Sequence, residues 1–208
     1  MIYLKNIPDH LIEDSIISLK ENRVPESKIL EYKRALPSDN NEDKREFLAD
    51  ISSFANTVGG NIIFGIREEK GIPVEIPGLE IGDYDKLISK LTSILRDCIE
   101  PRIPGIDIKP LKLSSGAKIL IILIPKSFNA PHVIKLGGHW RFYSRHSIGK
   151  YPLEVSELRS IFTSTVALRE KIKNFRNEKI SQKNIVCKYQ FHQVPRFIYI
   201  IFHYLGFD

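Results

Sequence analysis

The chain contains little cysteine, which argues against a cysteine-bound metal site and against a disulfide-stabilised scaffold. Two cysteines, Cys98 and Cys187, occur in 208 residues, and neither has the spacing of a metal ligand. A disulfide-stabilised scaffold is therefore not expected, and a reducing cytoplasm is the expected location. No apolar run reaches the roughly 18 residues of a membrane-spanning helix. The first residues also lack the apolar core of a signal peptide.

Several motifs of catalysis and nucleotide binding are missing as well. No Gly-x-x-x-x-Gly-Lys-Ser/Thr sequence is present, so a P-loop is excluded and ATP binding has no support from the sequence. No Gly-x-Ser-x-Gly motif or paired Cys–His motif is present. His132, His139 and His146 fall on loop and strand segments, where a spacing of seven does not place them on one face. A zinc site is therefore not expected.

The charge of the chain favours an acidic partner. Lysine and arginine number 31 against 25 acidic residues, a formal net charge of +6, and 42% of the residues are hydrophobic. This composition is typical of a soluble globular protein, and its basic balance favours a partner such as nucleic acid. Residues 166–188 hold seven basic and two acidic residues, an excess of +5. We therefore place the end of the folded domain near Phe175.

The chain is organised around a helix, a Gly-Gly turn and a strand. Apolar residues of the predicted helix 42–58 recur at spacings of three and four: Phe47, Ile51, Phe54, Ala55 and Val58. Gly59 and Gly60 then form a turn, for which a structural role is favoured over phosphate binding, because a helix C-terminus repels anions. The continuous apolar runs 61–66 and 118–125 predict strands in the centre of a sheet.

Further amphipathic helices are predicted on both sides of this unit. One covers residues 9–21, a second covers 83–98 with Asp83 as its cap, and a third runs from 152 or 153 to 175. The inner face of the third helix is expected to hold Leu158, Ile161, Phe162, Leu168, Ile172 and Phe175. Shorter extended segments are predicted at 29–34, 74–78, 106–113 and 140–145.

Glu26, Glu31 and Lys33 form the cluster of polar residues that most strongly suggests a functional site. Two carboxylates five residues apart, the second on a strand, converge if a turn lies between them. Paired carboxylates hold Mg²⁺ or Mn²⁺, and a nearby lysine neutralises charge that develops on a phosphate. The alternative is a solvated strand face on which Glu31 pairs with Lys33 or Arg34. Spacing alone leaves both open and favours the solvated face.

A second candidate surface is the strand 140–145. Arg141, Tyr143 and Arg145 share one face, which we expect to point outward, with His146 beside it. Such a basic and aromatic face suits phosphates and stacked bases. The alternative, a face covered by another element, has equal weight. The basic run 166–188 is either a phosphate-contacting arm or, slightly favoured, a solvated helix end. Lys150, Arg169 and Lys173 complete the candidate nucleic-acid-binding residues.

Three separated motifs occur in a set order along the chain. They are Glu-Tyr-Lys-Arg-Ala-Leu-Pro at 31–37, Phe-Leu-Ala-Asp-Ile-Ser-Ser-Phe-Ala-Asn-Thr-Val-Gly-Gly-Asn-Ile-Ile-Phe-Gly-Ile at 47–66, and Arg-Phe-Tyr-Ser-Arg with Gly-Lys-Tyr-Pro within 141–152. In order and rough spacing they resemble the Schlafen AlbA-like domain over about residues 26–175. The resemblance implies a mixed α+β fold, which we expect to be a mainly antiparallel sheet packed by amphipathic helices. Residues 1–25 would be an N-terminal helix and 176–208 a basic, then apolar, tail.

The resemblance also implies functions. Bacterial and archaeal members are described as DNA-binding proteins or transcriptional regulators. Vertebrate Schlafen ribonucleases use two such lobes, and an acidic triad with Mg²⁺ or Mn²⁺, to cleave structured RNA. Glu26 and Glu31 match two members of that triad. The third would be Glu68 or Glu69, while Arg67 stands where an acid is common in the family.

The favoured function is therefore a nucleic-acid-binding module, for DNA or RNA, with a regulatory or defence role. The alternatives are a divalent-metal-dependent endoribonuclease, in which Lys33 gives electrostatic support, and a protein-interaction module. Because one lobe is half of the two-lobed assembly, a homodimer is expected. No membrane partner is expected.

Overall fold

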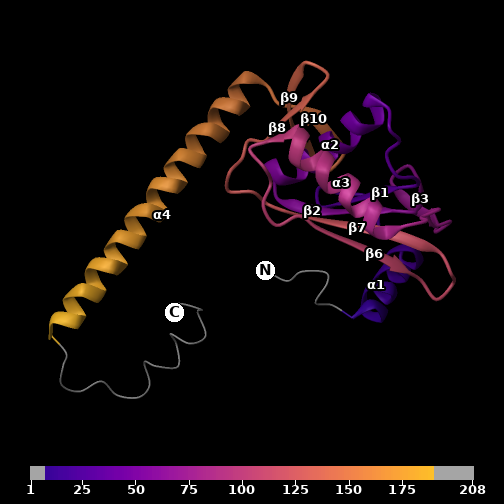
Figure 1. Cartoon of the computed structure of the whole chain (residues 1–208), viewed down its shortest axis with the longest axis horizontal. Helices are drawn as coiled ribbons and strands as arrows, with labels where there is room; N and C mark the ends of the chain where they lie inside the picture. The colour runs from indigo at the N-terminus through magenta and orange to yellow at the C-terminus, as the bar shows by residue number, and fades with distance from the viewer. Residues whose placement is uncertain (1–7, 190–208) are drawn as a thin grey trace. The chain divides into compact units, whose positions relative to one another are not determined.

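The structure is a computed structural model that describes residues 8–189, and the side chains of residues 8–167 and 170–180. It divides into two compact units, Met1–Phe162 and Thr163–Asp208. Figure 1 shows the arrangement of the helices and strands, most of which carry labels. The apolar segment noted near the end of the chain lies outside the described residues, and the boundaries set at 26 and 175 stay predictions. Among the described residues, no helix combines the length and apolarity that crossing a bilayer requires.

The chain alternates helices and strands. The helices are α1 (Asp9–Glu21), α2 (Asn41–Asn56), α3 (Tyr84–Cys98) and α4 (Val155–Tyr189). The strands are β1 (Leu30–Lys33), β2 (Gly59–Phe64), β3 (Arg67–Glu69), β4 (Ile72–Glu75), β5 (Ile99–Glu100), β6 (Asp107–Lys112), β7 (Lys118–Pro125), β8 (Val133–Leu136), β9 (His139–His146) and β10 (Gly149–Pro152). The predicted cap Asp83 is confirmed, because its side chain accepts a hydrogen bond from the Asp85 N–H at the start of α3. At the start of α2 the Asn40 side chain accepts one from the Asp43 N–H.

The main sheet has the strand order β1-β2-β7-β6. The β1–β2 pair is parallel, while β2–β7 and β7–β6 are antiparallel. The two runs predicted as central strands, 61–66 and 118–125, form the inner strands β2 and β7. The expected fold, α+β with a mainly antiparallel sheet, is confirmed.

The continuous apolar runs are explained by a core on each face of the main sheet. One core, packed on α2 and α3, takes alternate strand residues: Ile62, Phe64, Leu120, Ile122 and Ile124. The other, packed on α1, takes the residues between them, Ile63, Ile119 and Ile121, together with Tyr32 of β1 and Ile66, two residues after β2. Figure 1 shows α1 and α2 on opposite sides of β6 and β7. Since each fully buried side chain of this size stabilises by about 1.5–3 kcal/mol, both faces need apolar residues.

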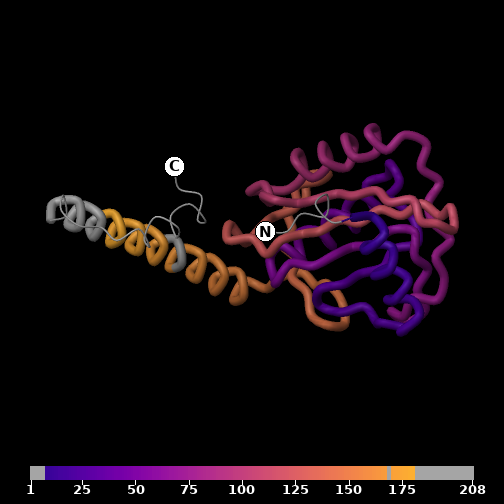
Figure 2. Tube along the Cα trace, turned by 90° about the horizontal axis from the view of Figure 1, so that it is seen from below, coloured from indigo at the N-terminus to yellow at the C-terminus, as the bar shows by residue number. Residues whose placement is uncertain are grey.

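Helix α2 is the centre of the first unit. It contacts β2 and β7 of the main sheet and also β8, β9 and β10 of a second sheet, whose order is β10-β9-β8-β5. Between two sheets the helix has almost no solvent-facing side, so every residue from Phe47 to Ala55 is buried. That run includes three polar residues. Ser52 and Ser53 donate to backbone carbonyls one turn earlier. The third, Asp50, needs charged partners. Figure 2 shows the strands crossing this unit beneath α3.

The Gly-Gly turn after α2 is required for steric reasons. Gly59 has a φ of +80°, which side chains disfavour. A Cβ on Gly60 would lie 2.5 Å from the Phe54 ring and 2.6 Å from the Ile29 carbonyl oxygen. These contacts support the structural role favoured from the sequence.

Helix α4 corrects one prediction. It runs to Tyr189, beyond the expected end at 175. Three side chains expected on a buried inner face are exposed, Phe162 by 51%, Ile172 by 49% and Phe175 by 60%. The apolar residues recur at helical spacing as predicted, but these three side chains are not buried. Leu168 lies outside the described side chains.

Candidate functional site

The centre of the candidate site is the Glu31 carboxylate on β1. Because Leu30 and Tyr32 face the α1 core, strand alternation turns Glu31 and Lys33 toward α2. One Glu31 oxygen lies 2.8 Å from the Lys33 ammonium. The other lies 2.5 Å from the Arg145 guanidinium, which comes from β9, 114 positions later in the sequence. The charged face of β1 is thus not a solvated face but an internal contact between β1, α2 and β9.

Asp50 of α2 extends this contact into a chain of ion pairs. Its side chain is 2% exposed. Lys33 reaches one oxygen at 3.3 Å, and Lys150 of β10 reaches the other at 2.7 Å. Lys150 also pairs with Glu46 on the same helix. We name the six side chains Glu31, Lys33, Glu46, Asp50, Arg145 and Lys150 the ion-pair network. It joins β1, α2, β9 and β10.

Arg145 is the most deeply placed member of the ion-pair network. The residue is 2% exposed, and its guanidinium lies 3.7 Å from the centroid of the Phe54 ring. Its Nε and Nη1 have no hydrogen-bond partner among the described residues, so Glu31 is its counter-charge. The expectation that Arg145 points outward is wrong. The side chain packs under α2, where it cannot meet a bound polymer.

The pKa values reflect this pairing. Burial raises the pKa of Glu31, but hydrogen bonds from Lys33 and Arg145 outweigh burial and hold the pKa below its usual value. Burial lowers the pKa of Lys33, and the charges of Asp50 and Glu31 more than reverse this. Burial raises the pKa of Asp50, against the opposing effect of Lys150. Charged Glu31 and charged Lys33 are therefore the stable forms at neutral pH.

Glu26 and Glu68 lie beside this network and bind backbone groups. Glu26 accepts a hydrogen bond from the Tyr32 N–H at 2.8 Å, and Glu68 accepts one from the Gly71 N–H at 2.5 Å. Burial raises the pKa of Glu26; the Tyr32 N–H opposes this, and the negative charges of Glu31 and Glu68 add to it. The three predicted carboxylates therefore lie near enough to interact.

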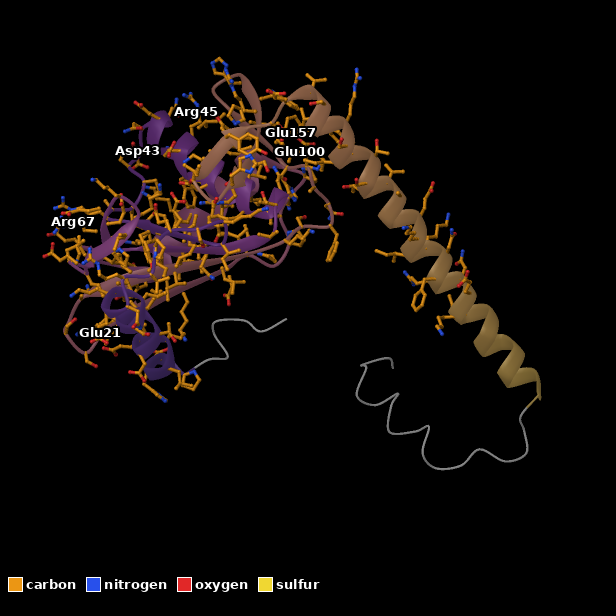
Figure 3. The ribbon with its side chains drawn as sticks, turned by 180° about the vertical axis from the view of Figure 1, so that it is seen from behind. Glu21, Asp43, Arg45, Arg67, Glu100 and Glu157 are labelled. Atoms are coloured by element: carbon orange, nitrogen blue, oxygen red, sulfur yellow. The ribbon has the colours of Figure 1, made fainter. Side chains whose placement is uncertain are left out.

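Arg67 and Glu69 point away from this group. Arg67 donates to Glu69 at 2.6 Å and to Glu75 at 3.0 Å, both on the β3–β4 hairpin. Figure 3 shows Arg67 at the periphery of the molecule. Of the two glutamates considered for the third position, Glu68 is the one beside Glu26. The arginine that pairs with a carboxylate of this group is therefore not Arg67 but Arg145, which contacts Glu31.

Comparison with known sequences identifies the family. The sequence model of the family described as Schlafen, AlbA_2 matches residues 26–154. The chain belongs to this family. No curated protein matches the chain.

Matching solved structures include the DIP2311 protein from Corynebacterium diphtheriae, which is 17% identical over 73% of this chain with a TM-score of 0.47. The chain spans 28% of the length of that protein. Another is the N-terminal domain of a RecG-related protein from Nitrosomonas europaea, which is 19% identical over 65% of this chain and 85% of that one, with a TM-score of 0.43.

In this Schlafen AlbA_2 domain the donor set does not fit a divalent ion. A metal needs carboxylate oxygens that are free to bind it, whereas both oxygens of Glu31 already contact cations. The ion-pair network is balanced, with three carboxylates against three cations. Among the described residues, no three His, Cys, Asp or Glu side chains are grouped so as to hold a metal ion. The metal roles of Glu26, Glu31 and Glu68 stay predictions.

The predicted nucleic-acid-binding residues differ in exposure and in the contacts that they make. Arg141 is exposed near the start of β9, and Tyr143 is half-buried against the α2 core. Lys150 belongs to the ion-pair network. Lys173 is exposed on α4, and the Arg169 side chain lies outside the description. Arg141, Tyr143 and Arg145 therefore do not form the outward-facing basic and aromatic surface that was expected.

Two positions that matter for the candidate site and its surroundings were missed in the sequence. Asp50 stands between Phe47 and Phe54 at spacings of three and four, so it falls on the apolar face of α2. A carboxylate on the buried face of a helix needs a cation as its partner. The position of Asp50 among apolar residues was therefore the feature of the sequence that could have predicted a buried ion pair. The second is Trp140, which strand alternation places on the face of β9 opposite Arg141 and which is 66% exposed.

Proposed function

We propose that this domain binds nucleic acid and does not cleave it. The observation that carries the proposal is the pairing of both Glu31 oxygens with Lys33 and Arg145, which leaves this central carboxylate without an oxygen free to bind a metal ion. Membership of the Schlafen AlbA_2 family supports association with nucleic acid. The proposal leaves DNA and RNA as alternative ligands.

Exposed cations provide the attraction. Arg141, Lys171, Lys173 and Arg176 are exposed and have no ion-pair partner among the described side chains. Cations of this kind neutralise backbone phosphates and release bound counterions, a term that dominates affinity at low salt. Phosphate contacts position the polymer without reading its sequence.

A salt titration tests the proposal. Fluorescence anisotropy of the full chain with labelled single-stranded DNA, single-stranded RNA, duplex DNA and transfer RNA should give affinities that fall steeply with salt. Arg141→Gln should lower the slope of log affinity against log salt by about one. Lys28→Gln, an exposed lysine on another part of the chain, is the matched control and should leave the slope unchanged. Absence of binding to every probe refutes the proposal.

The same complexes test the nuclease alternative. Each nucleic acid is incubated with Mg²⁺, Mn²⁺ or EDTA beside a Glu26→Ala/Glu31→Ala variant. We expect intact substrate throughout. Cleavage that disappears both in EDTA and in the variant would establish a metal-dependent endoribonuclease or deoxyribonuclease and would refute the non-catalytic assignment.

The predicted homodimer is part of this proposal. It rests on the family resemblance, in which one lobe makes half of a two-lobed assembly. Light scattering over a range of protein concentrations, with and without a bound oligonucleotide, tests it. A monomer at high concentration in both states would contradict it, and would also leave a single copy as the binding unit.

A further inference from the structure

One face of the β8–β9 hairpin carries exposed aromatic side chains. Trp140 is 66% exposed, and Phe142, two residues along the same strand face, is half-buried. The Phe142 ring meets the Phe162 ring edge to face, with centroids 6.3 Å apart. Phe162 is itself 51% exposed. Large apolar rings exposed side by side are unusual on a soluble surface and mark a binding site.

The surface around Trp140 is hollowed. An open hollow of about 570 Å³ lies between the start of β9 and the segment that joins β10 to α4. Trp140, Arg141 and Phe142 line one side, and Leu153 and Leu158 line the other. All of these residues belong to the first unit. The hollow therefore combines aromatic rings, an aliphatic wall and one guanidinium.

Two cations lie next to Trp140 at the start of β9. Lys135, directly opposite Trp140 on β8, places its ammonium 5.1 Å from the indole centroid. Arg141 follows Trp140 and has no ion-pair partner among the described side chains. A molecule bound in this hollow would therefore meet the Trp140 indole, with the Lys135 ammonium over its ring, and the Arg141 guanidinium.

Carboxylates limit where an anion can lie. Glu100 pairs with Lys135, and Glu157 accepts a hydrogen bond from the Tyr151 hydroxyl at 2.8 Å. Figure 3 labels both glutamates. Tyr151 stacks on His146 at the far end of β9, so that end of the strand has aromatic rings beside a negative charge. The Trp140 end, next to Arg141, is the better place for a phosphate.

We propose that a single-stranded segment of nucleic acid binds this hollow, with a base stacked on Trp140 and a backbone phosphate at Arg141. The inference rests on the proposed function and names the form of nucleic acid recognised. Bases of a duplex stack on one another and present only their edges, whereas an unpaired base offers its π-face to an aromatic ring. An indole with a neighbouring guanidinium matches that pair of groups.

Trp140 is the sole tryptophan of the chain, so its fluorescence reports this contact directly. Titration of the full chain with oligothymidylate or oligouridylate should quench the emission, and titration with a blunt duplex should not. Trp140→Ala should weaken binding of the single strands about five- to a hundredfold, the usual range for one stacked base. Trp140→Phe should recover part of the affinity. Phe128→Ala, which removes another exposed ring on the loop after β7, is the matched control and should leave binding and quenching unchanged.

The outcomes separate this inference from the proposed function. Binding by anisotropy without quenching, and with equal affinity for Trp140→Ala, overturns the stacking site and leaves nucleic-acid binding intact. Binding to no probe overturns both. A wild-type dimer that becomes a monomer in Trp140→Ala overturns the inference and assigns the aromatic face to contact between copies of the chain.

Discussion

Replacement of Glu31 by glutamine is expected to destabilise the domain, because it removes the counter-charge of a buried arginine. Arg145 has a side chain that is 1% exposed, and Glu31 is its ion-pair partner at 2.5 Å. In Glu31→Gln the guanidinium stays buried on the Phe54 ring without a carboxylate. Lys33, in contrast, keeps Asp50 as a partner. The predicted loss therefore comes from Arg145 and not from Lys33.

The size of the effect follows from the cost of an unpaired buried charge. Removing one partner of a buried ion pair costs about 3–5 kcal/mol. We expect about 3 kcal/mol, at the lower end, because the glutamine oxygen still accepts a hydrogen bond from Arg145. For a folded unit of about 150–250 residues this lowers the melting temperature by about 6–12 °C. Arg145→Met alone should also lower the free energy of unfolding, because it leaves the buried Glu31 without Arg145. The double variant Glu31→Gln/Arg145→Met should lose less stability than the sum of the two single variants.

Thermal unfolding in EDTA, followed by circular dichroism, measures the effect. Glu69→Gln is the control, since it removes an exposed partner of Arg67 and should leave the melting temperature unchanged. A higher melting temperature for Glu31→Gln than for the wild type would refute the reasoning. If Glu26, Glu31 and Glu68 formed an empty metal site, removal of one carboxylate would relieve repulsion and raise the melting temperature. In that case Mn²⁺ would stabilise the wild type.

Three further predictions concern other positions. Burial raises the pKa of Glu26, so the stability from its protonated form is complete below the unfolded-state value and is lost as the pH rises through the folded-state value. Glu26→Gln should therefore lose less stability than wild type between about pH 4 and pH 7 in urea titrations, and equal losses would contradict this. Burial lowers the pKa of His132, so its ring signals in NMR should titrate below about 6.5, and a midpoint at or above that value would place the ring in solvent. Gly60→Ala drives a Cβ into Phe54 and should lower the melting temperature sharply, whereas Gly82→Ala, which meets nothing within 4 Å, should not; equal effects would reject the steric account.

Sequence patterns alone determined much of the architecture. Continuous apolar runs identified β2 and β7 as inner strands, because only a strand with a core on each face lacks polar alternation. The Gly-Gly turn and the Asp83 cap also follow from local chemistry. Three ordered motifs were enough to identify the Schlafen AlbA_2 family. Each of these signals is contained within a short stretch of chain.

The tertiary structure alone decided what the polar residues do. Alternation shows that Arg141, Tyr143 and Arg145 share a face of β9, but a period of two is the same whichever face is buried. Helix α2, packed between two sheets, covers the Tyr143 and Arg145 side and leaves Trp140 exposed. Arg145, one of the two cations that pair with Glu31, lies 114 positions away, a distance over which no sequence periodicity operates. A local pattern determines which residues point the same way, and only the packing of distant elements determines what they meet there.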